Sequence, residues 1–533
     1  MLAIRRHVTT IGALTLAFAG CLVWIKSRDH SRLAPVFGNG ATYDSPSTLP
    51  PTTGGNAKNF ATTLIPFGQA TPEYLIETDD QRICNSAFGP EYLKYIASHQ
   101  RPYCEPQSLA NVQCFTTHRL TEPWEPFWDD DQLCLAQGVL YNPATSPENG
   151  QPSFRMQCDP RNFTRESMAS EAAAKELGGV RPLTNMSVYW YDTGVGAAFK
   201  EWQFASKEDA AGCTAANGNN EWIILARREG NDNIWHKLME IWQARLTFDA
   251  LRLAVHPTTG KPWLSSEQAA TVRVVIDDDR TEQFDDLWNI VTGNLALRRS
   301  DLVPGTCYGN VVIPLAGSSS PFWQALIEIV YHETCRTTFL MNAFLRRVFD
   351  HYAIKPRPAI DFQAEPTITI IDRRTRRKLY NQEALVEAVR TRYPNSTVRV
   401  EDLATLSFRQ QIELAQSTDV LVGHHGAGMA HVLFMPIDSA VVEYLPPWFP
   451  IGGFRSIGRM RGLAYFTGHA VHREEWEHTV KGVPLPEGWT RPQNDWAWQE
   501  SEWVYILEED LLGMIDAAVR NQRNRLFDRP PQA

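Results

Sequence analysis

The chain is 533 residues long, carries a formal net charge of −10 and is 43% hydrophobic. This length exceeds one ordinary hydrophobic core, so we expect two or more domains in a globular protein rather than a disordered chain. The acidic balance argues against nucleic-acid binding, because no excess of basic residues exists to neutralise phosphates.

The N-terminal residues predict a membrane anchor followed by a stem. Residues 8–25 form an almost uncharged run that is just long enough to span a bilayer, with basic residues on both sides. A cleavable signal peptide is the alternative, because Ala17-Phe18-Ala19 resembles a small-residue cleavage site. We expect residues 1–7 to be a cytoplasmic tail, residues 8–25 a transmembrane signal anchor and residues 26–70 a flexible stem rich in Pro, Gly, Ser and Thr.

Cysteine usage supports a lumenal location for the bulk of the chain. Cys21 lies in the apolar run and leaves an even number of cysteines, which suggests disulfide bonds in an oxidising compartment. Zinc is the alternative, and it is disfavoured because no CxxC pair occurs. The sequons at Asn162, Asn185 and Asn395 add mild support, and we expect residues 71–181 to be a cysteine-rich region stapled by disulfides. The remaining cysteines are Cys84, Cys104, Cys114, Cys134, Cys158, Cys213, Cys307 and Cys335.

Residues 182–355 alternate between predicted strands and predicted helices, and Pro356 with Pro358 marks a domain boundary. The best-defined helix, Asn233–Leu246, is predicted to be amphipathic, with Ile234, Leu238, Ile241 and Trp242 on one face. The predicted strands are Ser187–Tyr191, Trp222–Leu225 and Val272–Ile276, and the other predicted helices lie at Phe284–Val291 and within Phe322–Arg347.

Residues 356–470 show the same alternation more clearly, and residues 471–533 form a C-terminal extension. Such repeated alternation predicts a doubly wound parallel sheet that binds ligands at the carboxyl ends of its strands. Asn381 is expected to cap a helix that runs to Arg392, and Ser407 with Gln410 forms a predicted capping box. The predicted strands are Thr367–Ile371, one around Val398 and Val400, Val420–Val422 and Ala440–Leu445; the later predicted helices are Met429–Phe434 and Leu507–Arg520.

The stretch Gly423-His424-His425-Gly426-Ala427-Gly428 lies between a predicted strand and a predicted helix. Glycines allow backbone angles and close approaches that other residues forbid, and the N-terminus of a helix presents free N–H groups. The stretch therefore predicts an anion site. A metal bound by His424, His425 and His431 is the less favoured alternative, because no carboxylate or cysteine accompanies them.

A second turn, at the end of the predicted strand Thr367–Ile371, carries five basic side chains. A run of charge is usually only a solvated face, but here it would open on the same crevice as the glycine turn. Because the planar fork of arginine suits a diphosphate, the two turns together predict a nucleotide-diphosphate site. Glu443, at the end of a nearby strand, would accept hydrogen bonds from a ribose. The basic side chains are Arg373, Arg374, Arg376, Arg377 and Lys378.

In combination, these segments resemble the family-61 glycosyltransferases. The resemblance rests on Asp419–Leu445, on the basic segment Asp372–Gln382 and on Arg459–Leu463. Asn233–Glu240 resembles the family's N-terminal helix motif, in which an Asp is usual at the position of Glu240. The resemblance covers roughly residues 233–463 and leaves out the cysteine-rich region.

The resemblance implies a GT-B-like α/β fold in which two Rossmann-like domains face a cleft. Residues 182–355 would be the acceptor domain and residues 356–470 the donor domain. Family members invert the anomeric carbon of a nucleotide-activated sugar, and such a transfer needs a base to take the proton of the acceptor hydroxyl. His236 is our candidate for this base and Glu240 is the second candidate.

The resemblance also implies roles at the donor site. Arg373 and Arg377 would hold the diphosphate, and Asn381 would order their loop. His425 would complete the phosphate cradle, together with the backbone N–H groups of Gly426 and Gly428. In the same reading, Glu443 would face the nucleoside.

One acidic motif favours a different chemistry. Asp277-Asp278-Asp279 contains the DxD pattern with which GT-A transferases hold a divalent metal, but a second such run, Asp129–Asp131, shows how easily the pattern arises. We interpret Asp277–Asp279 as a solvated turn. The chemistry is therefore expected to use a UDP-sugar donor and to require no cofactor, with a divalent metal as the open alternative.

These observations predict an inverting glycosyltransferase, a single-pass type II membrane protein on the lumenal side of the Golgi or endoplasmic reticulum. It would move N-acetylglucosamine from a UDP-sugar to a hydroxyl of a protein or glycan. Transfer of xylose from UDP-xylose in a β1,2 linkage and a non-catalytic scaffold are the alternatives. A dinucleotide-dependent oxidoreductase is disfavoured because no GxGxxG motif with a downstream acid is present.

Overall fold

The computed structural model describes residues 84–85, 87–117, 131–143, 152–204, 212–230, 232–323, 335, 338–447, 449, 454–471, 492, 497 and 500–528. All of them belong to one compact unit, Phe67–Ala533. The predicted tail, anchor and stem lie outside the described residues. Within the described ranges, none of the helices combines the length and the apolar character that crossing a bilayer requires.

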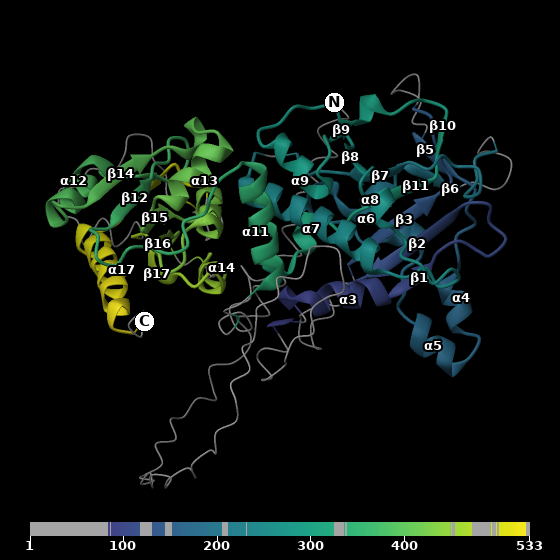
Figure 1. The fold of residues 1–533 in the computed structure, drawn as a ribbon, viewed down its shortest axis with the longest axis horizontal. Coiled ribbons are helices and arrows are strands. Elements are labelled where there is room, and N and C mark those ends of the chain that lie inside the picture. The colour runs from purple at the N-terminus through teal and green to yellow at the C-terminus, as the bar shows by residue number, and fades with distance from the viewer. Residues whose placement is uncertain are drawn as a thin grey trace, which may run out of the picture. The chain divides into compact units, whose positions relative to one another are not determined.

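A mixed seven-stranded sheet organises the first half of the described chain (Figure 1). Strands β11, β7, β8 and β9 run parallel to one another, while β1, β2 and β3 are antiparallel and join the sheet through the pairing of β3 with β11. Three strands of the cysteine-rich region, β1, β2 and β3, thus belong to this sheet. In spatial order the strands are β1 (Gln100–Pro102), β2 (Asn111–Thr116), β3 (Gln132–Gln137), β11 (Asn310–Ile313), β7 (Trp222–Ala226), β8 (Arg273–Ile276) and β9 (Leu297–Arg298).

Both faces of this sheet are covered. Alternate residues of β7, such as Ile224, pack with the central helix α7 (Ile234–Leu253), and the intervening residues, such as Ile223, pack with Phe199 of α6 (Gly194–Phe199) and with a second, smaller sheet. That sheet has the order β10 (Thr306–Tyr308), β4 (Val139–Tyr141), β5 (Phe154–Met156) and β6 (Trp202–Phe204). The other helices are α3 (Pro90–Ser98), α4 (Phe163–Ser167), α5 (Glu171–Leu177), α8 (Ser266–Ala269), α9 (Asn289–Thr292) and α11 (Phe339–His351), with 3₁₀ turns η2 (Leu183–Asn185), η3 (Trp190–Asp192), η4 (Asp285–Trp288), η5 (Arg299–Asp301) and η6 (Gly317–Ser319).

The second half contains a five-stranded, fully parallel sheet, as the alternating pattern predicts. Each neighbouring pair of its strands is parallel, and the apolar runs that predict its strands are buried. Its order is β14 (Thr397–Glu401), β12 (Thr367–Ile371), β15 (Val420–His424), β16 (Ala440–Leu445) and β17 (Ala464–His469). The carboxyl ends of β12 and β15 are adjacent, so the basic turn and the glycine turn start side by side.

Helices cover both faces of the parallel sheet, and the C-terminal residues supply one of them (Figure 1). One face packs against α12 (Gln382–Arg392) and α17 (Glu508–Asp528), and the other against α13 (Phe408–Gln416), α14 (Arg455–Met460) and the 3₁₀ helix η8 (Ala427–Phe434). The capping box of Ser407 and Gln410 is confirmed. A 3₁₀ turn η7 (Leu403–Thr405) precedes α13, and a two-stranded ladder joins β13 (Lys378–Leu379) to β18 (Trp503–Val504).

Three local predictions are wrong. Ser187–Tyr191 is not a strand: the backbone turns there, and Tyr191 and Asp192 both have positive φ angles, of 57° and 55°. The helix Asn233–Leu246 forms but extends to Leu253, and it is buried on nearly all sides instead of being amphipathic, because the sheet and the helices enclose it. Asn381 lies at the cap position of α12 with φ of 54°, but its side chain makes no capping hydrogen bond.

The eight cysteines pair into four disulfides, as their even number predicts. The pairs are Cys84–Cys335, Cys104–Cys158, Cys114–Cys134 and Cys213–Cys307.

Removal of a disulfide is expected to destabilise the fold by about 2–4 kcal/mol, more for a longer closed loop. Cys213–Cys307 spans 94 residues and Cys114–Cys134 spans 20. A Cys213→Ser, Cys307→Ser variant should therefore unfold at a lower temperature than a Cys114→Ser, Cys134→Ser variant, and both below the wild type. Thermal unfolding of the Cys213 variant at the wild-type temperature would contradict this pairing.

Candidate functional site

The glycine turn after β15 is shaped to bring two arginines against the backbone. Gly426 has φ of 147°, and a Cβ atom there would lie 2.9 Å from a terminal nitrogen of Arg373 and equally close to one of Arg377. Any other residue would be strained and would also collide with the guanidinium groups. The backbone of the predicted anion-binding turn and both predicted diphosphate ligands thus meet at one point.

The five cations of the basic turn are not equivalent. Arg374 pairs with Asp372 at 2.6 Å, Arg376 pairs with Glu500, and Lys378 pairs with Glu502. Arg373 and Arg377 form no ion pair with any residue in the described ranges. The two cations that face Gly426 are therefore the two whose charge no carboxylate balances directly.

Burial makes this unbalanced charge costly. It lowers the pKa of Arg373, and burial together with the charge of Arg373 lowers the pKa of Arg377 to about 10. One terminal nitrogen of Arg377 donates to the carbonyl oxygen of His425 at 2.8 Å, whereas its buried Nε has no acceptor among the described residues. An anion placed between the two guanidinium groups would relieve both their repulsion and their lost hydration.

His425 is held by a fully buried carboxylate. Its Nδ1 lies 2.8 Å from Oε1 of Glu443, while Oε2 of Glu443 accepts hydrogen bonds from the Tyr465 hydroxyl at 2.7 Å and from the backbone N–H of Phe454 at 3.1 Å. The side chain of Glu443 is 0% exposed. Glu443 therefore lies beneath His425 and orients its ring, and its oxygens are already engaged by protein donors.

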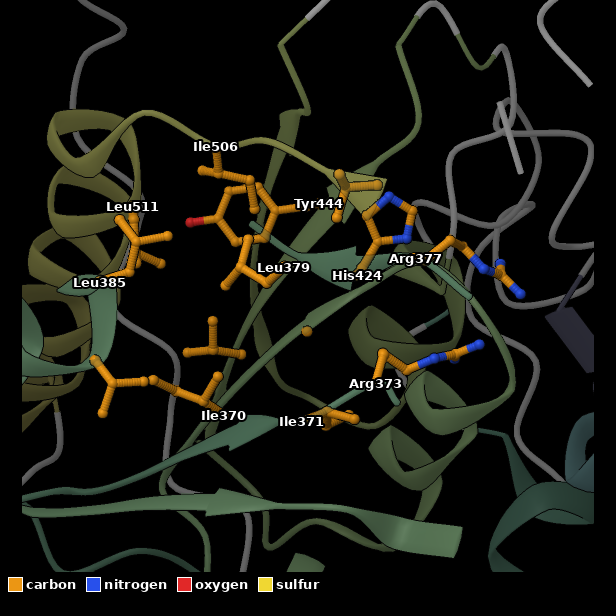
Figure 2. A pocket seen from close by; sticks show the side chains of 14 residues that line it. Ile370, Ile371, Arg373, Arg377, Leu379, Leu385, His424, Tyr444, Ile506 and Leu511 are labelled. Carbon is orange, nitrogen blue, oxygen red and sulfur yellow. The ribbon is translucent and has the colours of Figure 1, made fainter. Parts of the chain in front are cut away.

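A small, shallow pocket, partly open to solvent, lies on the apolar side of these turns (Figure 2). Ile370, Leu385 and Leu511 line one end, and the guanidinium groups of Arg373 and Arg377 point away from them. The pocket is thus the hydrophobic floor beneath the basic turn, whereas the charged groups face the opposite side.

The remaining residues predicted around these turns lie in the following places. Asn381 is exposed at the start of α12, and Gly428 accepts a hydrogen bond from His431 through its carbonyl oxygen. His431 is buried and its other ring nitrogen contacts Gln411, so it packs the turn from within. Burial and the charge of Arg377 lower the pKa of His424, which keeps this ring neutral.

In the first half, His236 forms a second histidine–glutamate pair. It lies in the first turn of α7, and its Nδ1 contacts Oε2 of Glu229, whose side chain is buried. The rings of Trp323 and Tyr191 lie 4.4 Å and 5.9 Å from the ring of His236 between centroids. Because a carboxylate at Nδ1 favours a proton on that nitrogen, Nε2 is left as the basic atom.

Glu240 supports this pair from one turn further along α7. Its Oε1 accepts a hydrogen bond from the backbone N–H of Glu229 at 2.5 Å, and Nζ of Lys237 lies 3.3 Å from its Oε2. Burial raises the pKa of Glu240 to about 7, with Lys237 opposing and Glu229 adding to the rise. Gly317 leaves room for it, since a Cβ atom there would lie 2.8 Å from Cγ of Glu240.

Aromatic contacts connect the two histidine–glutamate pairs. The ring of Trp235, next to His236 in α7, lies 5.1 Å from the ring of Phe454, and Phe454 lies 5.8 Å from the ring of His425. The same Phe454 donates its backbone N–H to Glu443. Trp235, Phe454 and residues of η8 belong to one continuous hydrophobic core.

The acidic turn after β8 is occupied by protein donors. Asp277 lies 3.4 Å from Arg299, Asp278 pairs with the fully buried Arg228 at 2.6 Å, and Asp279 accepts a hydrogen bond from the backbone N–H of Ser300. The part of the chain that the structure describes contains no group of three or more metal-ligating side chains arranged to hold a metal ion.

Sequence reasoning missed the residues that orient the site. Glu229 follows β7 in a loop with no motif, and Tyr465 and Phe454 are ordinary aromatic residues in the sequence. Glu229 lies between the predicted strand Trp222–Leu225 and the predicted helix that carries His236, seven residues before that histidine. This position is the one sequence signal that points to Glu229.

Comparisons with known proteins agree with this geometry. The family model described as Glycosyltransferase 61 matches residues 312–442, which include β12, β15 and the first half of β16. The EGF domain-specific O-linked N-acetylglucosamine transferase of Xenopus laevis is 32% identical over 157 residues, which are 29% of this chain and 28% of that protein. The protein of the same name from Mus musculus is 35% identical over 157 residues, again 29% and 28%.

A more distant relative extends the match slightly. The EGF domain-specific O-linked N-acetylglucosamine transferase of Drosophila melanogaster is 27% identical over 187 residues, which are 34% of this chain and 32% of that protein. The chain thus spans less than a third of the length of each of these relatives. The model match covers the turns that carry Arg373, Arg377 and Gly426. Over residues 312–442, the chain is therefore similar to the glycosyltransferase 61 family.

Proposed function

We propose that the chain is an inverting glycosyltransferase that moves a sugar from a UDP-sugar to a hydroxyl group of a protein or glycan. The observation that carries this proposal is the pair Arg373 and Arg377, which face Gly426 at the carboxyl ends of two parallel strands without an ion-pair partner among the described residues. A diphosphate has the charge and the oxygen spacing that two such forks bind.

In this proposal the two halves form a GT-B-like arrangement with a donor site on the parallel sheet. Arg373 and Arg377 hold the diphosphate, and the glycine turn contributes His425 and the N–H groups of Gly426 and Gly428. Asn381 orders the end of the basic turn. Glu443 acts through His425 instead of contacting the nucleoside, since its oxygens accept from His425, Tyr465 and Phe454.

Inversion follows from a single displacement at the anomeric carbon. The acceptor oxygen forms a bond to this carbon, the bond to the diphosphate oxygen breaks, and the acceptor proton passes to the base. The charge that develops on the leaving UDP is stabilised by the two guanidinium groups. No covalent intermediate on the protein is needed.

We assign the base role to Nε2 of His236. The Glu229 carboxylate at Nδ1 orients the ring and stabilises the imidazolium that forms when Nε2 takes the proton. Glu240 is buried, and one of its oxygens accepts from the N–H of Glu229, so it supports the loop instead of taking the acceptor proton.

The reaction is proposed to need no metal ion. The arginines supply the positive charge that a metal would otherwise place beside the diphosphate. Asp277, Asp278 and Asp279, the candidate DxD, are engaged by Arg299, Arg228 and Ser300.

N-acetylglucosamine is the favoured sugar, because the relatives that this segment resembles carry that sugar in their names. Xylose from UDP-xylose is the alternative.

The four disulfides favour an oxidising compartment, so we propose the lumenal side of the secretory pathway, with residues 8–25 as the anchor. A non-catalytic scaffold is disfavoured, because it would gain nothing from holding Arg373 and Arg377 half-buried without an ion-pair partner among the described residues.

UDP binding tests the donor site. We expect the wild type to bind UDP equally with EDTA or with manganese, and an Arg373→Ala, Arg377→Ala variant to bind about 100-fold more weakly, roughly 3 kcal/mol. Arg374→Ala is the matched control in the same turn, because Arg374 already pairs with Asp372 and its side chain is 72% exposed. Calorimetry measures all three. Equal affinity in the double variant, or binding that needs manganese, would contradict the proposal.

Turnover tests the base. His236→Ala should lower the rate of UDP release from UDP-N-acetylglucosamine, with water as acceptor, by about 10²–10⁴-fold and leave UDP affinity unchanged. Glu229→Gln should lower the same rate by at least about tenfold. His256→Ala, in the turn after α7, serves as control. If the His236 variant kept the wild-type rate, the base would have to be another residue.

The buried Glu240 should make stability depend on pH. Its pKa is raised from 4.5 to about 7, so the stability it contributes is fully present below pH 4.5 and is lost as the pH rises through 7. Glu240→Gln stays neutral, so between pH 5 and pH 8 its free energy of unfolding should rise relative to that of the wild type, by up to about 3 kcal/mol. Denaturant unfolding at a series of pH values measures this difference. Glu267→Gln, at an exposed position, is the control. A difference that does not change with pH would mean that Glu240 is ionised throughout.

A further inference from the structure

The basic turn is held by a segment that lies far from it in the sequence. The backbone N–H groups of Arg377, Lys378 and Tyr380 donate to the carbonyl oxygens of Ser501, Glu502 and Val504, each at 2.8 Å. These bonds accompany the parallel pairing of β13 with β18. Residues 500–505 lie outside the family-model match, whereas the turn that they hold lies inside it.

The side chains of residues 500–505, which we call the clamp segment, also decide which cations stay unbalanced. Glu500 pairs with Arg376 and Glu502 pairs with Lys378, and Nζ of Lys378 lies 3.8 Å from the ring centre of Trp503. Arg373 and Arg377, between and beside these pairs, form no ion pair with the clamp segment, and the charge of Glu500 opposes only part of the fall in the pKa of Arg377. The positive charge of the turn is thus concentrated on the two guanidinium groups at Gly426.

The backbone of Arg377 needs this support. Its φ of 57° is in the left-handed region, where a residue with a Cβ is strained. The hydrogen bond from its N–H to Ser501 holds this conformation, and the bond from its guanidinium group to His425 directs the side chain toward Gly426. Without the clamp segment the turn would relax toward ordinary backbone angles and the two arginines would separate.

The clamp segment is itself anchored in the protein. Val504, together with the following Ile506 and Leu511, lines the pocket beneath the basic turn (Figure 2). The backbone N–H of Val471, just after β17, donates to the carbonyl oxygen of Tyr505 at 2.8 Å. The clamp segment therefore connects the edge strand of the parallel sheet to the basic turn.

We propose that residues 500–505 are a part of the donor site that positions Arg377 for a nucleoside diphosphate. The proposal rests on the proposed function, and mutation of Trp503 tests it. Loss of the indole ring removes the contact with Lys378 and with the ring of Tyr380, 6.0 Å away, but leaves every ligand of the diphosphate in the chain.

The test is UDP affinity, measured by calorimetry on the whole chain. Trp503→Ala should weaken UDP binding about tenfold, and Trp503→Phe, which keeps an aromatic ring over Lys378, should restore affinity to within about twofold of the wild type. In an Arg377→Ala background, Trp503→Ala should cause no further loss, because the clamp segment acts through Arg377. If Trp503→Ala does not fold, Trp503→Leu takes its place.

Asp516→Ala is the matched control. Asp516 lies on α17 and joins the same C-terminal residues to the parallel-sheet half through Arg392, at 2.7 Å, and Tyr393, away from the basic turn. This variant should lose stability but keep wild-type UDP affinity.

Three results would overturn the inference and are distinguishable. Unchanged UDP affinity in Trp503→Ala would show that the clamp segment only stabilises the fold. An equal loss of affinity in the Arg377→Ala background would show that the segment does not act through Arg377. Absence of UDP binding by the folded wild type would overturn the proposed function, and the clamp's role at a nucleotide site with it.

Discussion

The rest of this site depends on one constraint, the close packing of the guanidinium groups of Arg373 and Arg377 against Gly426. Arg373 and Arg377 carry positive charge in a half-buried place, and burial lowers the pKa of both. Such an arrangement costs free energy in the folded chain, so the surrounding structure has to enforce it. Gly426 supplies the space, the His425 carbonyl supplies an acceptor, and the ladder with Trp503 and Val504 fixes the backbone.

Both predicted halves of the chemistry use the same construction, a histidine whose Nδ1 is held by a buried glutamate. Glu443 lies under His425 at the turn proposed to carry the donor site, and Glu229 lies under His236 at the start of α7. Phe454 contacts the ring of His425 and the ring of Trp235. One aromatic side chain therefore packs against the surroundings of both histidines.

The local elements of the second half could be predicted from the sequence because they are encoded by neighbouring residues. The apolar runs Thr367–Ile371 and Ala440–Leu445 are strands with those bounds, and Ser407 with Gln410 forms its capping box. The proximity of the glycine turn and the basic turn could also be predicted, because the carboxyl ends of parallel strands lie at the same edge of a sheet. These inferences need only local pattern and one rule of topology.

The rest depends on contacts between distant residues. The strand predicted at Ser187–Tyr191 fails because a turn with positive φ at Tyr191 is held from outside by Arg227, whose Nε donates to the carbonyl oxygen of Asp192. The burial of Glu443 and its three donors could not be seen from a glutamate at a strand end. The clamp segment lies more than 120 residues along the chain from its partners, and it contains no sequence motif that predicts this contact.

Hydrogen exchange upon addition of UDP tests the central claim most directly, because it reports on each segment separately. We predict slower exchange in three segments together, residues 373–380, residues 424–428 and residues 500–505, since one diphosphate would fix all three. Exchange that is unchanged in these segments at saturating UDP, or protection confined to other parts of the chain, would contradict the account.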